Sequence, residues 1–113
     1  MNRRGAPRFR MRVPVLAQWN DQAGDVKDVS GISRDISARG VFVVSSVQPP
    51  ESAQVMVEVI IPSLTQGAKE MHLSSDGLVV RVEESDGALG YAVHCDFRTK
   101  LLARLSSIEE RLI

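Results

Sequence analysis

The stretch Arg34–Val44, with the sequence RDISARGVFVV, is where a polar segment becomes an apolar strand. Asp35 and Ser37 are two residues apart, so in an extended chain both side chains point to the same side. Gly40 has no Cβ and permits a backbone conformation, or a close approach to a ligand, that other residues forbid. We interpret residues 35–40 as a turn that carries a small, acceptor-rich site.

The segments around this stretch alternate between apolar and polar side chains, which is typical of strands with one face in a core. The clearest is 54–61, which has valine or isoleucine at every second position. A break at 75–77 predicts a β-bulge that relieves the curvature of a closed sheet, and Asp86–Gly87 predicts a hairpin turn. The strands we expect are 13–20, 26–34, 41–45, 54–61, 71–84 and 89–97.

The spacing of the apolar residues changes after residue 98. Leu101, Leu105, Ile108 and Leu112 are spaced by four, three and four, which predicts an amphipathic helix over about 99–112. Its apolar face is expected to pack on the barrel, and a dimer contact is the alternative. Together these patterns predict an all-β fold: a six-stranded antiparallel β-barrel with a C-terminal α-helix at 13–113, preceded by a flexible basic arm at 1–12.

The charges are balanced overall but uneven along the chain. There are 14 basic and 14 acidic residues, whereas a general polyanion binder is expected to be more basic. The first dozen residues hold five arginines and no acid, which indicates a local anion site on a neutral body. We expect this arm to be flexible unless a ligand or the barrel pins it. The five arginines are Arg3, Arg4, Arg8, Arg10 and Arg12.

Several functional classes are disfavoured. Cys95 is the one cysteine, so no intrachain disulfide or cysteine-based metal cluster is expected. The two histidines, His72 and His94, stand in no catalytic motif, and no phosphate-binding loop or dinucleotide fingerprint is present. We see no signal peptide and no apolar run of membrane-spanning length. The expectation is a cytoplasmic protein that is not an enzyme and uses no metal or cofactor.

The arginines and Asp35 suit a guanine nucleotide. A guanidinium can grip phosphate oxygens, or the O6/N7 edge of guanine, with two parallel hydrogen bonds. A carboxylate such as Asp35 accepts hydrogen bonds, and guanine offers the N1–H and N2–H donors. The same residues also fit a structural ion pair or a turn cap, so the residues alone leave both interpretations open.

Two motifs resemble those of the PilZ domain family. Arg4-Gly-Ala-Pro-Arg8 resembles the family's RxxxR motif, and Asp35-Ile-Ser37-Ala-Arg-Gly40 resembles its [D/N]xSxxG motif. The later segments 77–81 and 90–97 also match the family's layout. The resemblance covers nearly the whole chain and implies a stand-alone receptor for cyclic di-GMP, the bacterial second messenger, without an attached output domain.

The resemblance also implies a role for each motif residue. Arg4 and Arg8 should contact phosphate and the guanine edge, while Asp35 should accept hydrogen bonds from guanine. Ser37 should bind a phosphate or a guanine edge, and Gly40 should permit close backbone approach.

Residues beside the motifs extend these expectations. An arginine directly before the first motif, here Arg3, is associated in the family with two stacked cyclic di-GMP molecules rather than one. Arg39 is a further candidate contact. Arg34 and Arg39 flank the site, and Arg81 and Arg10 are weaker candidates. The sequence does not decide whether Arg34, Arg39 or Arg81 touches ligand.

The expected mechanism is an ordering of the arm over a dianionic ligand, followed by signalling through an unidentified partner protein. Monomer and homodimer both remain open. One alternative is a PilZ-type adaptor of pilus or flagellar systems that binds no nucleotide. The other is a small barrel that binds RNA or DNA, which the low aromatic content and zero net charge disfavour.

Overall fold

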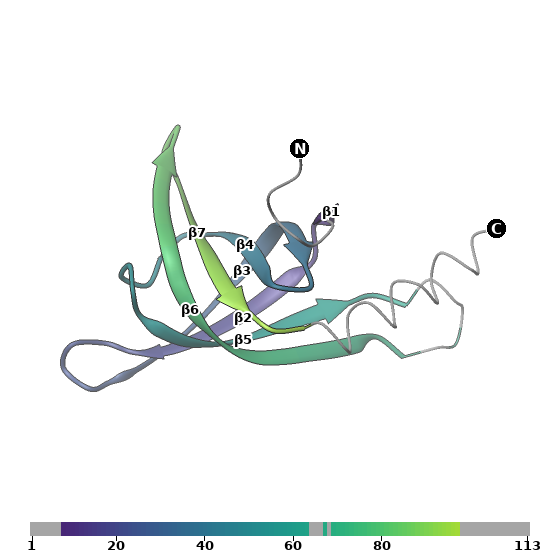
Figure 1. Ribbon diagram of the computed structural model, residues 1–113, viewed down its shortest axis with the longest axis horizontal. Coiled ribbons are helices and arrows are strands. Elements are labelled where there is room, and N and C mark those ends of the chain that lie inside the picture. Colours follow the sequence, from purple (N-terminus) through teal and green to yellow (C-terminus); the bar gives the residue numbers. More distant parts are fainter. Residues whose placement is uncertain (1–7, 64–66, 68, 98–113) are drawn as a thin grey trace.

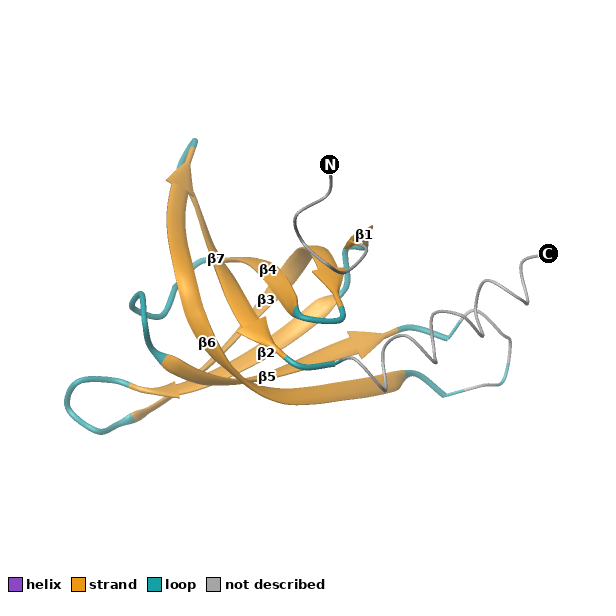
Figure 2. Cartoon of the chain, in the orientation of Figure 1, coloured by secondary structure: helices purple, strands orange, loops and turns teal. Residues whose placement is uncertain are grey.

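The computed structural model describes residues 8–63, 67 and 69–97, and all secondary structure in that part is β-strand (Figure 2). No helix in the described ranges has the length and apolar character needed to span a membrane. The strands are β1 (Arg8–Arg10), β2 (Pro14–Asn20), β3 (Val26–Ser37), β4 (Gly40–Ser45), β5 (Gln54–Ile61), β6 (Met71–Ser85) and β7 (Ala88–Cys95).

The strands form one antiparallel sheet that closes on itself. Its order is β1-β3-β2-β5-β6-β7-β4, and an additional pairing of β3 with β4 completes a ring of six strands, β2 to β7 (Figure 1). β1 is an extra strand that pairs with the end of β3. A closed barrel leaves few free sheet edges, and the predicted six-stranded antiparallel barrel is thereby confirmed.

β1 and β2 follow the same edge of β3, with a short interruption between them. β2 pairs with residues 26–32 of β3, and β1 pairs with residues 35–37. The buried Ser33 fills the interruption: its hydroxyl accepts a hydrogen bond from Val13 N–H at 3.0 Å and donates to the carbonyl oxygen of Met11. This anchor keeps β1 in place against β3.

The core consists mainly of β-branched side chains that point inward. β2 alternates between exposed and buried positions, and β5 between exposed or half-buried and buried positions, as their sequences predicted. Burying one such side chain stabilises the fold by about 1.5–3 kcal/mol, and valine also suits the pleated sheet. The least exposed core residues include Val15, Val43, Val57, Val59, Val79, Leu73, Tyr91 and Phe97.

The structure corrects two expectations about β3 and β6. Asp35 and Ser37 lie within β3 and not in a turn, and the turn comprises only Ala38 and Arg39. β6 runs unbroken through 75–77, and its bulge lies between Val79 and Arg81. Gly77 has a packing role instead, because a Cβ there would lie 2.5 Å from Val93 Cγ1 and 2.9 Å from the His94 carbonyl oxygen.

Two expectations concern the turns and termini. The predicted hairpin is confirmed: Ser85 pairs with Ala88, and Asp86 and Gly87 both have positive φ, 51° and 78°, as a two-residue type I′ turn requires. Residues 8–10, which the sequence placed in the flexible arm 1–12, form β1 on the barrel. The predicted helix at 99–112 lies outside the described residues.

Candidate ligand-binding face

Strand pairing brings the two motifs together on the outer face of the barrel. Arg8 is directly opposite Ser37, and Arg10 is directly opposite Asp35, across the β1–β3 pair. Directly opposed residues share a face of the sheet. The residue between the two arginines, Phe9, packs against the core instead. The structure therefore places Arg8, from the first motif, beside Asp35 and Ser37, from the second.

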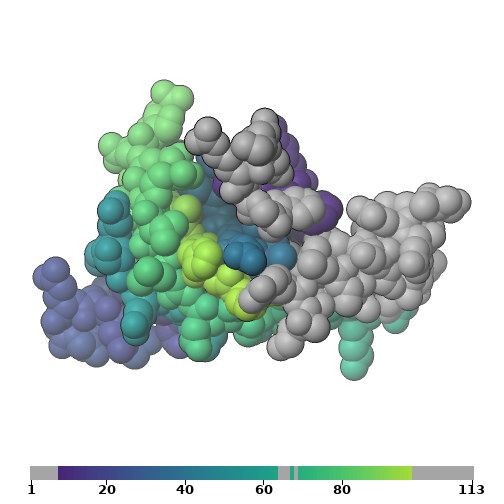
Figure 3. Space-filling view, viewed as in Figure 1, coloured from purple at the N-terminus to yellow at the C-terminus, as the bar shows by residue number. Residues whose placement is uncertain are grey.

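The pairing continues across three more strands. One row of opposed residues runs Arg10, Asp35, Phe42, Ala92, Arg81, and a second runs Arg8, Ser37, Gly40, His94, Leu78. The row between them faces the core, so the two named rows face outward. In that middle row Phe9 is partly buried, and the buried members are Ile36, Val41, Val93 and Val79. Figure 3 shows β6 and β7 side by side on this part of the surface. We call these two rows, with Arg34 and Arg39, the motif face.

The turn between β3 and β4 is fixed by hydrogen bonds. The Ser37 hydroxyl accepts from Arg39 N–H at 3.2 Å, and the carbonyl oxygens of Ala38 and Arg39 accept from Phe97 N–H and Cys95 N–H at 2.8 and 3.0 Å. Ser37 thus caps this turn while its side chain remains partly exposed. Arg39 is presented at the rim of the motif face.

Gly40 meets a requirement of the sheet itself. A Cβ at this position would lie 2.7 Å from the carbonyl oxygen of Val93 on β7. The close approach that the sequence analysis assigned to a ligand is therefore made, in the described structure, by a neighbouring strand. A role of Gly40 in ligand approach stays a prediction.

Asp35 has an ion-pair partner that precedes it directly in the chain. Arg34 Nε donates to Asp35 Oδ2 at 3.1 Å, and the Asp35 side chain is 17% exposed. The structural ion pair that the residues left open is therefore present. It engages one carboxylate oxygen, so Asp35 retains capacity to accept further hydrogen bonds.

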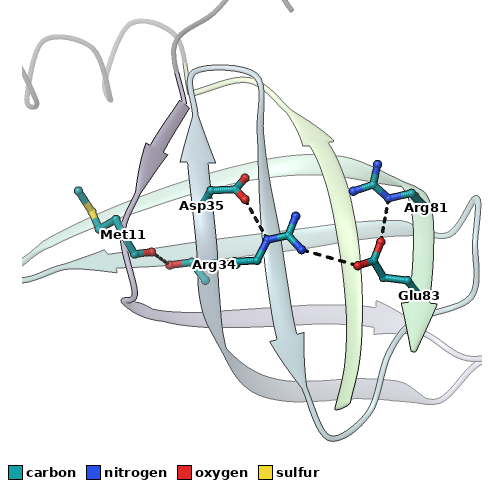
Figure 4. A network of polar contacts seen from close by, with 6 residues as sticks. Met11, Arg34, Asp35, Arg81 and Glu83 are labelled. Carbon is teal, nitrogen blue, oxygen red and sulfur yellow. Dashed lines mark hydrogen bonds and ion pairs between the residues drawn. The ribbon is translucent and has the colours of Figure 1, made fainter. Parts of the chain in front are cut away.

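Arg34 also joins a network across the outer face (Figure 4). Its guanidinium carbon lies 3.7 Å from the centroid of the Phe42 ring. Arg34 Nη1 lies 3.6 Å from Glu83 Oε1, and Arg81 Nε lies 3.2 Å from Glu83 Oε2. Phe42 and Glu83 were not singled out from the sequence, because only the strand register brings them beside Arg34 and Arg81.

Two hollows open on this surface. The smaller, of about 320 Å³, is lined by motif residues Arg8, Asp35, Ser37 and Gly40, together with Arg34, Arg39, Phe42, Val80, Arg81 and His94 among others. The larger, of about 920 Å³, is lined by Arg8, Arg10, Arg12, Ile32, Ser33, Arg34, Asp35 and Val44. Together they expose six arginines beside a single carboxylate, Asp35, a balance that favours an anionic ligand.

A third hollow, of about 840 Å³, lies between β2, β5, β6 and β7. Its lining includes Asp76 and Asp96 but no arginine or lysine, so it does not suit a phosphate. In the described part of the chain, no three His, Cys, Asp or Glu residues are grouped as a metal site would require. Burial raises the pKa of the Cys95 thiol to about 12, which leaves it protonated and a poor nucleophile at neutral pH.

The predicted site residues fall into three groups. Arg8, Asp35, Ser37, Arg39 and Gly40 are brought together on the motif face, and Arg34 and Arg81 adjoin them. Arg10, a weaker candidate from the sequence, and Arg12, which the sequence grouped only by charge, line the larger hollow. Arg3 and Arg4 lie outside the described residues.

Comparison with known proteins supplies a family and a fold. The family model described as PilZ domain matches residues 2–111 of the chain. No curated protein matches it.

Solved structures share the fold at low sequence identity. MotI/DgrA, the inhibitor of motility of Bacillus subtilis, has a TM-score of 0.69 at 15% identity, covering 84% of this chain and 43% of that one. The PilZ domain of YcgR from Escherichia coli, solved with c-di-GMP, has a TM-score of 0.63 at 16% identity, covering 98% and 95%. The PilZ domain of CeSA from a cellulose-synthesizing bacterium has a TM-score of 0.55 at 16% identity, covering 91% and 98%.

Proposed function

Because the chain belongs to the PilZ domain family, we propose that it is a receptor that binds cyclic di-GMP on the motif face. PilZ domains are receptors for this nucleotide and not enzymes, in agreement with the expectation from the sequence. The observation that carries the proposal is the β1–β3 register, which sets Arg8 opposite Ser37 and Arg10 opposite Asp35. Two separate motifs thereby supply cationic donors and an acceptor within one hollow.

Each motif residue has a role that its surroundings support. Arg8 is exposed and has no ion pair among the described residues, so its guanidinium is available for a phosphate or a guanine edge. Asp35 accepts from guanine N–H groups through the oxygen that Arg34 leaves open. Ser37 donates its hydroxyl to the ligand while it continues to accept from Arg39 N–H.

The remaining contacts belong to the same proposal. Arg4 binds alongside Arg8, and Arg39, at the rim, adds a further contact. Arg3 favours two stacked ligand molecules. The larger hollow directly beside the smaller one supports this stoichiometry, since both include Arg8 and Asp35 in their linings.

Ligand binding is also proposed to order the arm. Pairing of β1 with β3 already holds residues 8–10, so the change that we propose is confined to residues before Arg8. The ligand neutralises arginines that otherwise repel one another, and the ordered arm then engages a partner protein in the cytoplasm. The likeness to MotI/DgrA covers 43% of that chain, so any role in motility is part of the proposal.

Calorimetric titration with cyclic di-GMP tests the receptor proposal. We expect saturable binding by the wild type, loss of binding in Arg8→Ala, and no response to GTP. Lys27→Ala is the charge control, because Lys27 lies at the other end of β3, 3.9 Å from its partner Asp21. The molar ratio separates one bound ligand from two. A folded wild type that binds nothing would refute the receptor proposal and favour the adaptor that binds no nucleotide.

A further inference from the structure

Arg34 owes its position to a β-bulge. Ser33 pairs with Val43 and Asp35 pairs with Phe42, so Arg34 is an extra residue that has no partner on β4. Such a residue bends its strand and changes the direction of the side chains around it. Arg34 and Asp35 consequently both point to the outer face, whereas two neighbours in a regular strand point to opposite faces.

Three contacts then fix the Arg34 guanidinium in one place. It lies over the Phe42 ring at 3.7 Å, its Nε donates to Asp35, and its Nη1 faces Glu83 on β6. The guanidinium therefore extends from β3 across β4 and β7 towards β6. Phe42 is only 5% exposed although it lies on the outer face, and the guanidinium groups of Arg34 and Arg81 lie over its ring at 3.7 and 5.7 Å from the centroid.

Small residues on β7 leave room for the Phe42 ring beneath Arg34. Ala92 is opposite Phe42 in the β4–β7 pair. A Cβ on Gly90 would lie 2.6 Å from both Cε1 and Cζ of the Phe42 ring, so the absence of a side chain there provides the space for the ring. The ring can consequently lie under Arg34 and not project away from the barrel.

We propose that Arg34, supported by Phe42, is a stacking platform for one guanine base of the ligand. The inference rests on the proposed cyclic di-GMP binding and adds a residue that determines how a base is held. The Arg34 side chain is 49% exposed, so the guanidinium face away from Phe42 is open. Arg34 lines both hollows on this surface, which places that open face inside the site.

Arginine suits this role for a reason that lysine does not share. A guanidinium is planar and weakly hydrated, and it stacks on flat π systems, whereas an ammonium group is a compact, strongly hydrated point charge. Phe42 and a guanine base would hold the guanidinium plane between them. Asp35 and Glu83 keep the plane in position before ligand arrives, which lowers the cost of ordering it on binding.

The variant Arg34→Lys tests whether the planar guanidinium of Arg34 contributes to binding separately from its positive charge. The variant keeps a cation beside Asp35 and Glu83 but loses the plane. We expect the dissociation constant for cyclic di-GMP to rise about two- to fivefold, the range of an exposed cation–π contact. The dependence of affinity on salt should be unchanged, since the charge is retained. Phe42→Leu, which removes the ring below the plane, should weaken binding in the same direction.

The control is Lys27→Arg, an exchange between the same two residue types at the other end of β3, where Lys27 lies 3.9 Å from Asp21 and outside both hollows. Thermal unfolding of each variant verifies that it is folded. If Arg34→Lys or Phe42→Leu binds as tightly as the control, the platform is refuted while the receptor proposal stands. A weaker affinity with a reduced salt dependence would also refute it, because that result indicates a charge contact with phosphate. If the wild type binds no cyclic di-GMP, the receptor proposal fails and the platform fails with it.

Discussion

Replacing Gly40 with alanine tests whether the motif glycine serves the sheet or the ligand. The added Cβ would lie 2.7 Å from the Val93 carbonyl oxygen, well inside ordinary van der Waals contact. That oxygen belongs to the backbone of β7, which pairs with β4 over six consecutive residue pairs and with β6 on its other side. The clash cannot be relieved by turning a side chain, so the two strands must separate locally.

The expected cost follows from this rigidity. Forcing one extra methyl group into a well-packed site costs about 1–3 kcal/mol, from a total stability of about 5–15 kcal/mol for a domain. Each kcal/mol lowers the melting temperature of a domain of this size by about 4–8 °C. We therefore expect Gly40→Ala to destabilise the protein clearly in the absence of any ligand.

Urea denaturation and calorimetric melting of the ligand-free protein measure this effect. Ser37→Ala is the comparison, because it alters the same motif but removes only a partly exposed hydroxyl that caps the turn. The free energy of unfolding of Ser37→Ala should be lower than that of the wild type by at most about 1 kcal/mol. If Gly40→Ala unfolds like the wild type and only its ligand affinity falls, the glycine serves ligand approach and our account of the β4–β7 contact is wrong.

Three further predictions concern other parts of the barrel. Hydrogen bonds to Glu58, which has the larger effect, and to Glu70 raise the pKa of His72 above 6.5. The stability that the protonated His72 adds is fully present below pH 6.5 and is lost as the pH rises through the raised pKa. Melting temperatures measured across this pH range should therefore decline for the wild type, and His72→Gln should remove that decline. Because burial, and to a smaller extent Asp96, raises the pKa of Cys95 to about 12, the thiol should react with iodoacetamide only after unfolding in urea; rapid reaction of the native protein would contradict its burial. Glu83→Gln, with Glu84→Gln as control, should weaken cyclic di-GMP binding about two- to threefold through looser placement of Arg34, whereas tighter binding would show that Glu83 competes with the ligand.

Most of the barrel could be predicted from local patterns. Strands with one buried face carry a period of two, and the positions of β2 and β5 follow from it. The Asp86–Gly87 turn follows from the need for positive φ at both residues. The resemblance to PilZ domains, given by two short motifs, is confirmed by the family match over residues 2–111.

The departures from the prediction arise where distant strands decide the outcome. The polar residues 34–37 have the composition of a turn, yet pairing with β1 on one side and β4 on the other makes Asp35 and Ser37 part of a strand. Residues 8–10 form a strand because β3 offers them a free edge. Glu83 and Phe42 are separated from Arg34 in the chain, and only the register brings them together.

The two bulges explain how the fold produces the motif face. In β3, Ser33 points inward and is buried; because Arg34 is bulged out of the ladder, Asp35 points outward, whereas in a regular strand of the same sequence Asp35 would point inward like Ser33. In β6, Val79 points inward, and the extra residue Val80 turns Arg81 outward in the same way.

Both bulges lie beside the Phe42–Ala92 pair. At each of them the alternation of inward and outward side chains is offset by one residue. The outward row from Asp35 to Arg81 depends on these two offsets. Deleting Val80 should therefore leave Arg81 on the outer face opposite Ala92, because Val80 is the residue without a partner on β7 and its removal makes the ladder regular. Deleting the paired residue Val82 should instead put Glu83 opposite Tyr91 and turn the rest of β6 to the opposite face. We expect a larger loss of stability for the deletion of Val82 than for the deletion of Val80, which is 51% exposed. Equal unfolding curves for the two deletions would show that β6 can move its register freely, and the phase argument would then fail for Arg81.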